Sequence, residues 1–336
     1  AGTNILYGDN AQGKTNILEA IYLSGTTKSH KGSKDKEMIQ FGEDESHIRI
    51  FIEKQEKQFQ IDMHLKKNRT KGIAIDQIPI KKASELFGIL NIVFFSPEDL
   101  NIIKNGPAER RRFIDLELSQ LDKVYLNDLG NYNRIINQRN KLLKDISFNS
   151  GLKDTLDIWD IQLIEYGEKV IQARKKFVSD INEIISEIHK KLTGNQEQIE
   201  VIYEPNTGGQ SLGDVIQRNR ERDLRMMSTT SGPHRDDICF QVDGIDIRKF
   251  GSQGQQRTIC LSLKMAEVEL INEKTGAYPV LLLDDVLSEL DKNRQDYILK
   301  SINNIQTIIT CTGLDEITRN IGDKIKIFRV KEGKIL

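Results

Sequence analysis

The chain has 336 residues, of which 38% are hydrophobic and 29% charged, a composition typical of a globular protein with one or two domains. No apolar run is long enough to span a membrane, and three isolated cysteines exclude a disulfide framework and suit a reducing cytoplasm. Because 49 basic residues nearly balance 50 acidic ones, binding to nucleic acid would require positive charge gathered on one face.

The N-terminal part, to about residue 96, alternates between strand and helix patterns. A short apolar strand at 5–7 leads through a glycine-rich turn into a helix at 13–23. Three later segments alternate apolar and polar residues and predict antiparallel strands: 47–53, 59–65 and 73–80. A continuous apolar run at 91–95 predicts a buried strand.

The middle part, residues 107–229, has the pattern of helices. Apolar residues recur every three or four positions from 122 to 143 and, more regularly, from 157 to 192. Two such helices joined near 147–154 form an antiparallel hairpin, which either projects as an arm or packs flat as a helical subdomain. The sequence leaves these two alternatives open.

The C-terminal part, from residue 231, returns to alternating strands and helices. It predicts helices at 262–272 and 294–302, a buried strand at 280–283, another strand at 307–311, and an edge strand at 325–330. These strands must join those of the N-terminal part to complete one sheet. The predicted fold class is therefore α/β, with residues 1–120 and 229–336 forming a single domain and residues 121–228 a helical insertion.

The segment between the first strand and the first helix matches the GxxxxGK[ST] phosphate-binding motif, or Walker A. Its glycines let backbone N–H groups turn inward around a phosphate, and the helix N-terminus adds positive potential. Lys14 is predicted to neutralise phosphate oxygens and Thr15 to ligate Mg²⁺. The predicted ATP-binding residues are Gly8, Asp9, Asn10, Ala11, Gln12, Gly13, Lys14, Thr15 and Asn16.

An apolar strand that ends in two carboxylates supplies the matching Walker B element. Val280–Leu283 is the strand, Asp284 is predicted to lie beside the Mg²⁺ ion, and Asp285 to orient the attacking water. Asp285 and Lys14 are thus the candidate catalytic residues.

Two further segments indicate the subclass. Small residues before a helix, Ser252, Gln253, Gly254 and Gln255, offer free N–H groups and a positive helix dipole to a second anion. An ordinary capped helix would have the same sequence. Ser288 and Asp291 follow the Walker B strand closely.

Together these four segments resemble ABC-type ATPase heads, with a signature motif that would act on the partner's nucleotide and a D-loop after Walker B. Other stretches are similar to the RecF family of bacterial recombination mediators: 27–31, 95–100, 110–115, 118–120 and 231–237. The resemblance implies an ABC-type P-loop ATPase head, with a mixed sheet and flanking antiparallel strands, plus an inserted helical arm or lobe.

The resemblance also implies a function. It predicts a protein of DNA repair, replication and the SOS response that binds duplex or gapped DNA as an ATP-sandwiched dimer, with ATP and Mg²⁺ as cofactors and slow hydrolysis. RecR, with RecO, would be its partner in loading RecA. The sequence departs from the pattern of ABC-type ATPase heads at two positions that concern hydrolysis. Asp285 stands where those heads carry Glu, and Thr310-Cys311-Thr312 stands where they place a His that senses the γ-phosphate. The Ser96–Asp99 region is the candidate Gln-loop.

Positive charge is clustered at several places along the chain. The predicted DNA-binding residues belong to two clusters: Lys28, Lys31, Lys34 and Lys36, and Lys66, Lys67 and Arg69. Contacts from such clusters to phosphates are independent of sequence and sensitive to salt. Two further clusters lie at 110–112 and 174–176. In a chain without net positive charge such clusters are more often solvated faces, and the cluster at 28–36 is the more persuasive candidate because it lies in a loop-like stretch directly after the Walker A helix.

Three other classes of protein are alternatives: the ATPase subunit of a membrane transporter, an SMC-like chromosome-maintenance ATPase, and a small-molecule P-loop kinase. The first requires a membrane partner and the second a far longer coiled coil, while the signature and D-loop segments argue against the third. Dimerisation with ATP and binding to plain duplex DNA, with no membrane component, would separate them.

Overall fold

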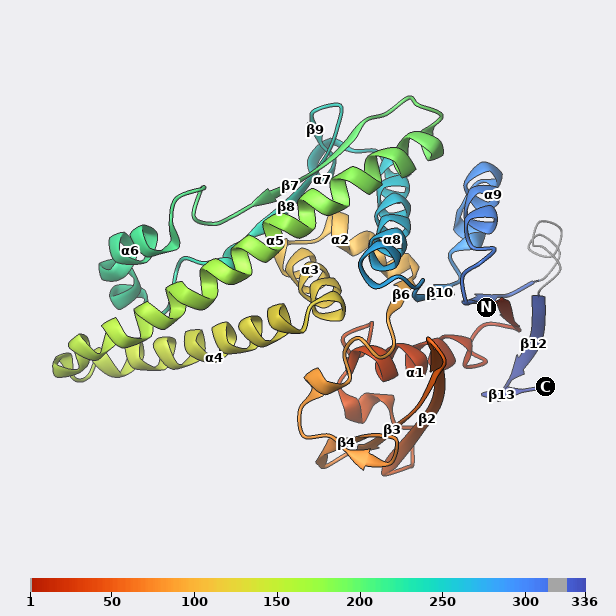
Figure 1. Ribbon diagram of the computed structural model, residues 1–336, viewed down its shortest axis with the longest axis horizontal. Coiled ribbons are helices and arrows are strands. Elements are labelled where there is room, and N and C mark those ends of the chain that lie inside the picture. Colours follow the sequence, from red (N-terminus) through yellow and green to blue (C-terminus); the bar gives the residue numbers. More distant parts are fainter. Residues whose placement is uncertain (1, 314–324) are drawn as a thin grey trace. The chain divides into compact units, whose positions relative to one another are not determined.

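The computed structural model describes residues 2–313 and 325–336, which fold into two compact units (Figure 1). The first unit contains residues 1–100, 191–194 and 260–336, and the second contains residues 101–190 and 195–259. The predicted division into residues 1–120 with 229–336 and residues 121–228 stays a prediction. Within the described ranges, no helix is long and apolar enough to cross a membrane.

The main sheet of the first unit has six strands in the order β13-β12-β1-β11-β10-β6, parallel except for β13. Their bounds are β1 Thr3–Tyr7, β6 Ile92–Phe95, β10 Val280–Asp284, β11 Thr307–Cys311, β12 Ile325–Lys331 and β13 Lys334–Ile335. The N- and C-terminal parts of the chain therefore share one sheet, as predicted. The prediction of an edge strand at 325–330 was wrong, because β13 pairs with the outer side of β12.

A second, antiparallel sheet of the first unit consists of β2 Glu45–Lys54, β3 Lys57–Lys66, β4 Arg69–Ile75 and β5 Ile78–Pro79. The single strand predicted at 73–80 is two strands. Asp76 and Gln77 both have positive φ, 50° and 68°, and form the two-residue turn of a tight hairpin. Apolar and polar residues keep alternating through this turn, so the pattern hides it.

The core of this sheet forms where its apolar face meets α1. Ile61, Met63 and Leu65 of β3 are buried together with Leu23 and Leu86. Besides α1 Lys14–Thr26, the first unit contains α9 Lys292–Ser301 and short 3-10 turns at Asp35–Met38, Ala83–Glu85, Pro97–Asp99 and Leu287–Glu289. Helix α8, Gln253–Thr275, begins in the second unit and ends in the first.

The second unit is mostly helical. Its helices are α2 Leu100–Lys104, α3 Pro107–Leu121, α4 Lys123–Ile146, α5 Leu156–Thr193, α6 Leu212–Met226 and α7 Ile247–Phe250, with 3-10 turns at Ser150–Thr155 and Pro233–Arg235. The first residue of α2 and the last three residues of α5 belong to the first unit. A three-stranded sheet adds β7 Ile199–Glu204, β8 Asp237–Val242 and β9 Ile245–Asp246. Strand β7 corrects the prediction that 107–229 is entirely helical, since Ile199 and Val201 alternate with outward residues and pair with β8.

Helices α4 and α5 form the predicted antiparallel hairpin. Tyr125 of α4 contacts Arg174 of α5 at 3.3 Å, and Arg139 contacts Asp160 at 2.6 Å. From the first contact to the second, the chain advances by fourteen residues in α4 and goes back by fourteen residues in α5, so the two helices run antiparallel. Gly167, the interior glycine of α5, lets Leu212 approach, since a Cβ there would lie 2.3 Å from the leucine Cδ2.

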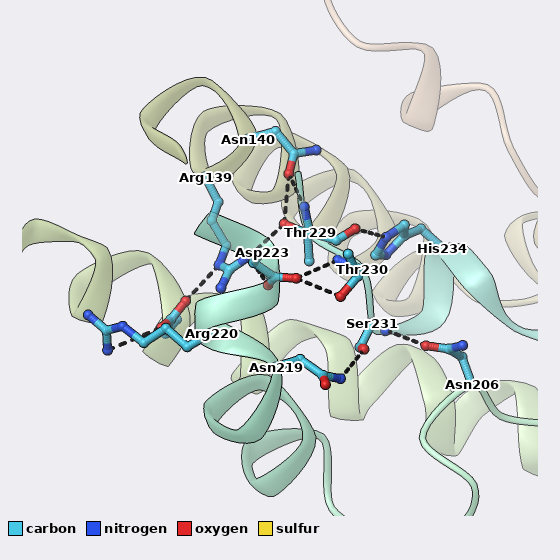
Figure 2. Close-up of polar contacts among 12 residues, drawn as sticks. Arg139, Asn140, Asn206, Asn219, Arg220, Asp223, Thr229, Thr230, Ser231 and His234 are labelled. Carbon is cyan, nitrogen blue, oxygen red and sulfur yellow. Dashed lines mark hydrogen bonds and ion pairs between the residues drawn. The ribbon is translucent and has the colours of Figure 1, made fainter. Parts of the chain in front are cut away.

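A buried polar network fixes the segment between α6 and β8 (Figure 2). Arg139, which is 0% exposed, donates to Asp160, Asp223 and Thr229. Asp223 in turn accepts from the backbone N–H and the hydroxyl of Thr230. A buried charge is costly unless it is paired, and these contacts supply the pairing. The network therefore gives the 228–235 segment one defined conformation.

Candidate nucleotide site

The phosphate-binding loop runs from the end of β1 to the start of α1, the context that the Walker A motif requires. Gly8 lies against the backbone of β12, where a Cβ would meet the carbonyl oxygen of Val330 at 2.4 Å. Gly13, with φ of 94°, precedes the helix in a conformation that favours glycine. Asp9, Asn10 and Ala11, like Asn16 in α1, are exposed. The loop is thus anchored to the sheet at Gly8.

Lys14 is buried within this loop. Its Nζ donates to the carbonyl oxygens of Gly8 at 2.6 Å and Asp9 at 2.8 Å. The side chain is only 8% exposed, so its ammonium group is held close to the loop rather than in solvent. A cation so placed is suited to neutralise the oxygens of a bound polyphosphate.

Thr15 and Asp284, the predicted metal ligands, lie together although 269 positions separate them in the chain. The Thr15 hydroxyl donates to Oδ1 of Asp284 at 3.0 Å. Hydroxyl and carboxylate oxygens are hard ligands, and Mg²⁺ is usually bound by one or two carboxylates together with phosphates and water. No group of three or more His, Cys, Asp or Glu side chains able to hold a metal occurs among the described residues. The pair therefore fits Mg²⁺ that is bound with a nucleotide.

Thr310 is a residue of this site whose contact the sequence did not predict. Its hydroxyl, at the end of β11, donates to Oδ1 of Asp284 at 2.7 Å and accepts from the backbone N–H of Asp285 at 3.0 Å. Both bonds follow from the parallel pairing of β10 with β11, which sets Asp284 opposite Thr310. A pairing of neighbouring strands cannot be read from either strand alone.

Asp285, the candidate water-orienting residue, follows the Walker B strand directly and has a positive φ of 54°, which is uncommon outside glycine. The Ser288 hydroxyl donates to its carbonyl oxygen at 2.8 Å and reaches its carboxylate at 3.3 Å. Cys311 lies nearby, and burial raises the pKa of its thiol to about 11, partly opposed by Lys14. The thiol is therefore neutral at physiological pH.

The predicted D-loop residue Asp291 has a clear structural contact. It is the N-cap of α9, where its carboxylate accepts from the backbone N–H of Arg294 at 3.1 Å. Ser288 and Asp291 are both in the first unit, as are the Walker A and Walker B residues.

The candidate Gln-loop is tied into the core of the first unit. Ser96 and Asp99 are buried, and the Ser96 N–H donates to Asp99 at 2.7 Å. His30 contacts the Ser96 hydroxyl at 3.1 Å, and Lys264 of α8 forms an ion pair with Asp99 at 3.4 Å. The segment after α1 and the segment after β6 are therefore connected by polar contacts.

The signature-like segment belongs to the second unit. Ser252 accepts from the Gln255 N–H at 3.2 Å, and the Gln255 side chain accepts from the Ser252 N–H at 3.0 Å. This reciprocal pair is a capping box at the start of α8, beside Gln253 and Gly254. Gly251 just before it tolerates no side chain, since a Cβ would lie 2.6 Å from the Ile247 carbonyl oxygen. The role of this segment toward a partner's nucleotide stays a prediction.

The two predicted DNA-binding clusters differ in how far their charge is neutralised. Lys28, Lys34 and Lys36 are exposed and form no ion pair within the described ranges, whereas Lys31 lies 3.8 Å from Glu98. In the other cluster, Lys66 pairs with Glu45 and Lys67 with Asp44, each at 3.3 Å, while Arg69 is exposed. The 28–36 segment therefore presents more unneutralised positive charge.

Two arginines from the remaining basic clusters are structural. Arg110 is 1% exposed and forms a bidentate ion pair with Asp237, at 2.6 and 3.0 Å. Arg174 is 2% exposed and bonds Asp115 and Asp236. Both guanidinium groups are committed to the core of the second unit, so neither is available to a phosphate.

A Walker A loop and a Walker B strand that meet at Thr15 and Asp284, on a six-stranded sheet beside an antiparallel sheet, define an ABC-type ATPase head. The chain matches the RecF/RecN/SMC N terminal domain family over residues 1–335 and belongs to it. Within that family the chain is a member of the RecF proteins.

Individual relatives and a solved structure point to the same family. The DNA replication and repair protein RecF of Agathobacter rectalis is 63% identical over 333 residues, which cover 99% of this chain and 92% of that protein. The same protein of Lachnospira eligens is 59% identical, with the same coverage. A solved structure of the recombination mediator protein RecF with ATP, from the RecFOR pathway, is 37% identical with a TM-score of 0.93, covering 100% of this chain and 91% of that one.

Proposed function

We propose that this protein is an ATP-dependent DNA-binding protein that acts in recombinational DNA repair and replication in the cytoplasm. Its relatives carry the name DNA replication and repair protein RecF, and a similar solved structure contains ATP. The contact between Thr15 and Asp284, beside the buried Lys14, carries the proposal, because it joins the two halves of a Mg²⁺–triphosphate site at one point.

In the proposed mechanism, residues of the phosphate-binding loop and of the Walker B strand bind and orient the nucleotide. Backbone N–H groups of the loop and the Lys14 ammonium bind the phosphates. Thr15 and Asp284 would hold Mg²⁺, which neutralises charge on the phosphate oxygens. Thr310 orients the Asp284 carboxylate, and Asp285 positions water for slow hydrolysis. Ser252–Gln255 of a second copy would close over the γ-phosphate, so that the dimer forms only with ATP.

DNA would bind to this dimer through the exposed lysines of the 28–36 segment, by phosphate contacts that are independent of sequence. RecR, together with RecO, would act as its partner in loading RecA. The similar solved structure is that of a recombination mediator protein RecF in the RecFOR pathway, which supports this proposal.

The proposal is tested by fluorescence anisotropy of a labelled plain duplex with ATP, with ADP and without nucleotide. We expect tight binding with ATP and weak binding in the other two conditions. A Thr15→Ala variant should bind weakly in all three, because Mg²⁺–ATP loses a ligand. Equal DNA affinity with and without ATP in the wild-type protein would contradict the proposal.

A further inference from the structure

The turn between β12 and β13, residues Glu332 and Gly333, is bonded to the phosphate-binding loop. The N–H of Glu332 donates to the side-chain oxygen of Gln12 at 2.7 Å, and the N–H of Gly333 donates to the Gln12 carbonyl oxygen at 2.9 Å. A Cβ on Gly13 would lie 3.3 Å from the Gly333 Cα, so the turn also touches the loop directly. Both N–H groups of the turn thus donate to Gln12, a residue of the Walker A motif.

Gln12 is the residue immediately before Gly13 and Lys14. A phosphate-binding loop works because its N–H groups converge on the anion, which requires its carbonyl groups to find partners elsewhere. The Gly333 N–H supplies the partner for one such carbonyl group, and the Glu332 N–H holds the side chain of the same residue. The turn therefore fixes the conformation of the loop at Gln12, two residues before Lys14.

The turn keeps this position at an energetic cost. Glu332 has a φ of 50°, a left-handed conformation that is unfavourable for a residue with a side chain. Lys331 and Lys334 pair directly opposite each other across the hairpin, and like charges in that arrangement are destabilising. Both lysines are exposed and form no ion pair within the described part of the chain. A polyphosphate in the adjacent loop would offset this repulsion.

We propose that the β12–β13 hairpin is a positioning element of the nucleotide site: its turn holds the phosphate-binding loop through Gln12, and its paired lysines add positive potential beside it. The ligand is a nucleoside triphosphate, so the inference rests on the proposed ATP binding. The hairpin thereby sets the affinity of the Walker A motif for the nucleoside triphosphate, although 320 positions separate Gln12 from Glu332 in the sequence.

The test compares two matched glycines. Gly333 and Gly276 have φ of 74° and 69°, and a Cβ at either would meet no atom within 4 Å. Valine strains the backbone equally at both positions, but only Gly333 bonds the loop. With a fluorescent ATP analogue, Gly333→Val should raise Kd roughly tenfold, the loss expected from weakening two hydrogen bonds, and Gly276→Val should leave it unchanged.

A double-mutant cycle separates positioning from general destabilisation. Gln12→Ala removes the side-chain acceptor, so Gly333→Val should cost less affinity in that background than in the wild-type protein. In addition, Lys331→Ala with Lys334→Ala should weaken binding at low salt but not at high salt.

Equal Kd values for Gly333→Val and Gly276→Val, or strictly additive effects of Gln12→Ala and Gly333→Val, would overturn the inference while leaving ATP binding intact. A wild-type protein that fails to bind the analogue would instead overturn the proposed function.

Discussion

The hydroxyl of Thr310 lies 2.7 Å from Oδ1 of Asp284, the same carboxylate oxygen that the Thr15 hydroxyl contacts at 3.0 Å. Two neighbouring strands and the phosphate-binding loop thus converge on one oxygen atom. Thr310 also accepts from the backbone N–H of Asp285, so a single side chain contacts both the Asp284 carboxylate and the backbone of Asp285.

Thr310→Val should therefore impair hydrolysis more than binding. Valine keeps the shape but removes the bonds to Asp284 and Asp285, and hydrogen bonds to charged groups contribute about 1.5–3 kcal/mol. We expect kcat to fall by roughly ten- to hundredfold, with a smaller change in Kd for ATP. Thr310→Ser, which restores the hydroxyl, is the control. An unchanged kcat for the valine variant would remove Thr310 from the site.

Lys14→Ala should abolish nucleotide binding. The ammonium group is held 2.6 Å from the Gly8 oxygen, and without it the crowded triphosphate oxygens lack a neutralising charge. Lys14→Arg should retain some binding but impair turnover, since the planar guanidinium fits the loop poorly. Isothermal calorimetry with ATP checks both variants. Wild-type affinity in Lys14→Ala would contradict the assignment of the phosphate site.

Neutralising Lys28, Lys31 and Lys34 together should weaken DNA binding equally for all sequences. It should also flatten the line of log K against log salt by up to about three phosphate contacts, at roughly 0.9 per contact. The matched control is Lys66→Ala with Lys67→Ala, whose charges are already paired with acids and whose loss should change the slope less. Identical slopes for the triple variant and the wild type would make the 28–36 segment a solvated face.

His234 should make the second unit less stable in acid. Its Nε2 donates to the Thr229 carbonyl oxygen and its Nδ1 accepts from the Tyr132 hydroxyl, as Figure 2 shows for the first of these bonds. Burial lowers the pKa of the imidazole to about 4 from 6.5. Since the folded state binds the proton less well, stability is fully present above about pH 6.5 and falls toward pH 4, by roughly 2–3 kcal/mol.

Thermal unfolding at several pH values checks this prediction. His234→Gln should show a shallower loss of the melting temperature between pH 6.5 and 4 than the wild type. Equal slopes in the two proteins would assign the acid sensitivity to other groups.

The phosphate site could be predicted from the sequence because its chemistry is local. Eight consecutive residues form the Walker A loop, and two adjacent acids end an apolar strand. The contacts of Thr310 and of the β12–β13 turn could not be predicted, because they depend on which strands become neighbours in the sheet.

The errors in the fold have similar causes. The two-residue turn at Asp76 and Gln77 interrupts neither the alternation nor the hydrophobicity, so two strands look like one. Strand β7 is short and lies in a region of long helices. In the same way, charge alone could not distinguish the exposed lysines of the 28–36 segment from the buried Arg110 and Arg174, whose acidic partners are far away in the sequence.

The central claim, an ATP-sandwiched dimer, is tested most directly by sedimentation velocity on Asp285→Asn with ATP. This change removes the proposed water-orienting carboxylate, so we expect a long-lived dimer and little phosphate release. Adding Ser252→Arg places a bulky side chain where the partner's γ-phosphate would lie, and should return the protein to a monomer that still binds ATP. A Ser252→Arg protein that dimerises as the parent does would contradict the account.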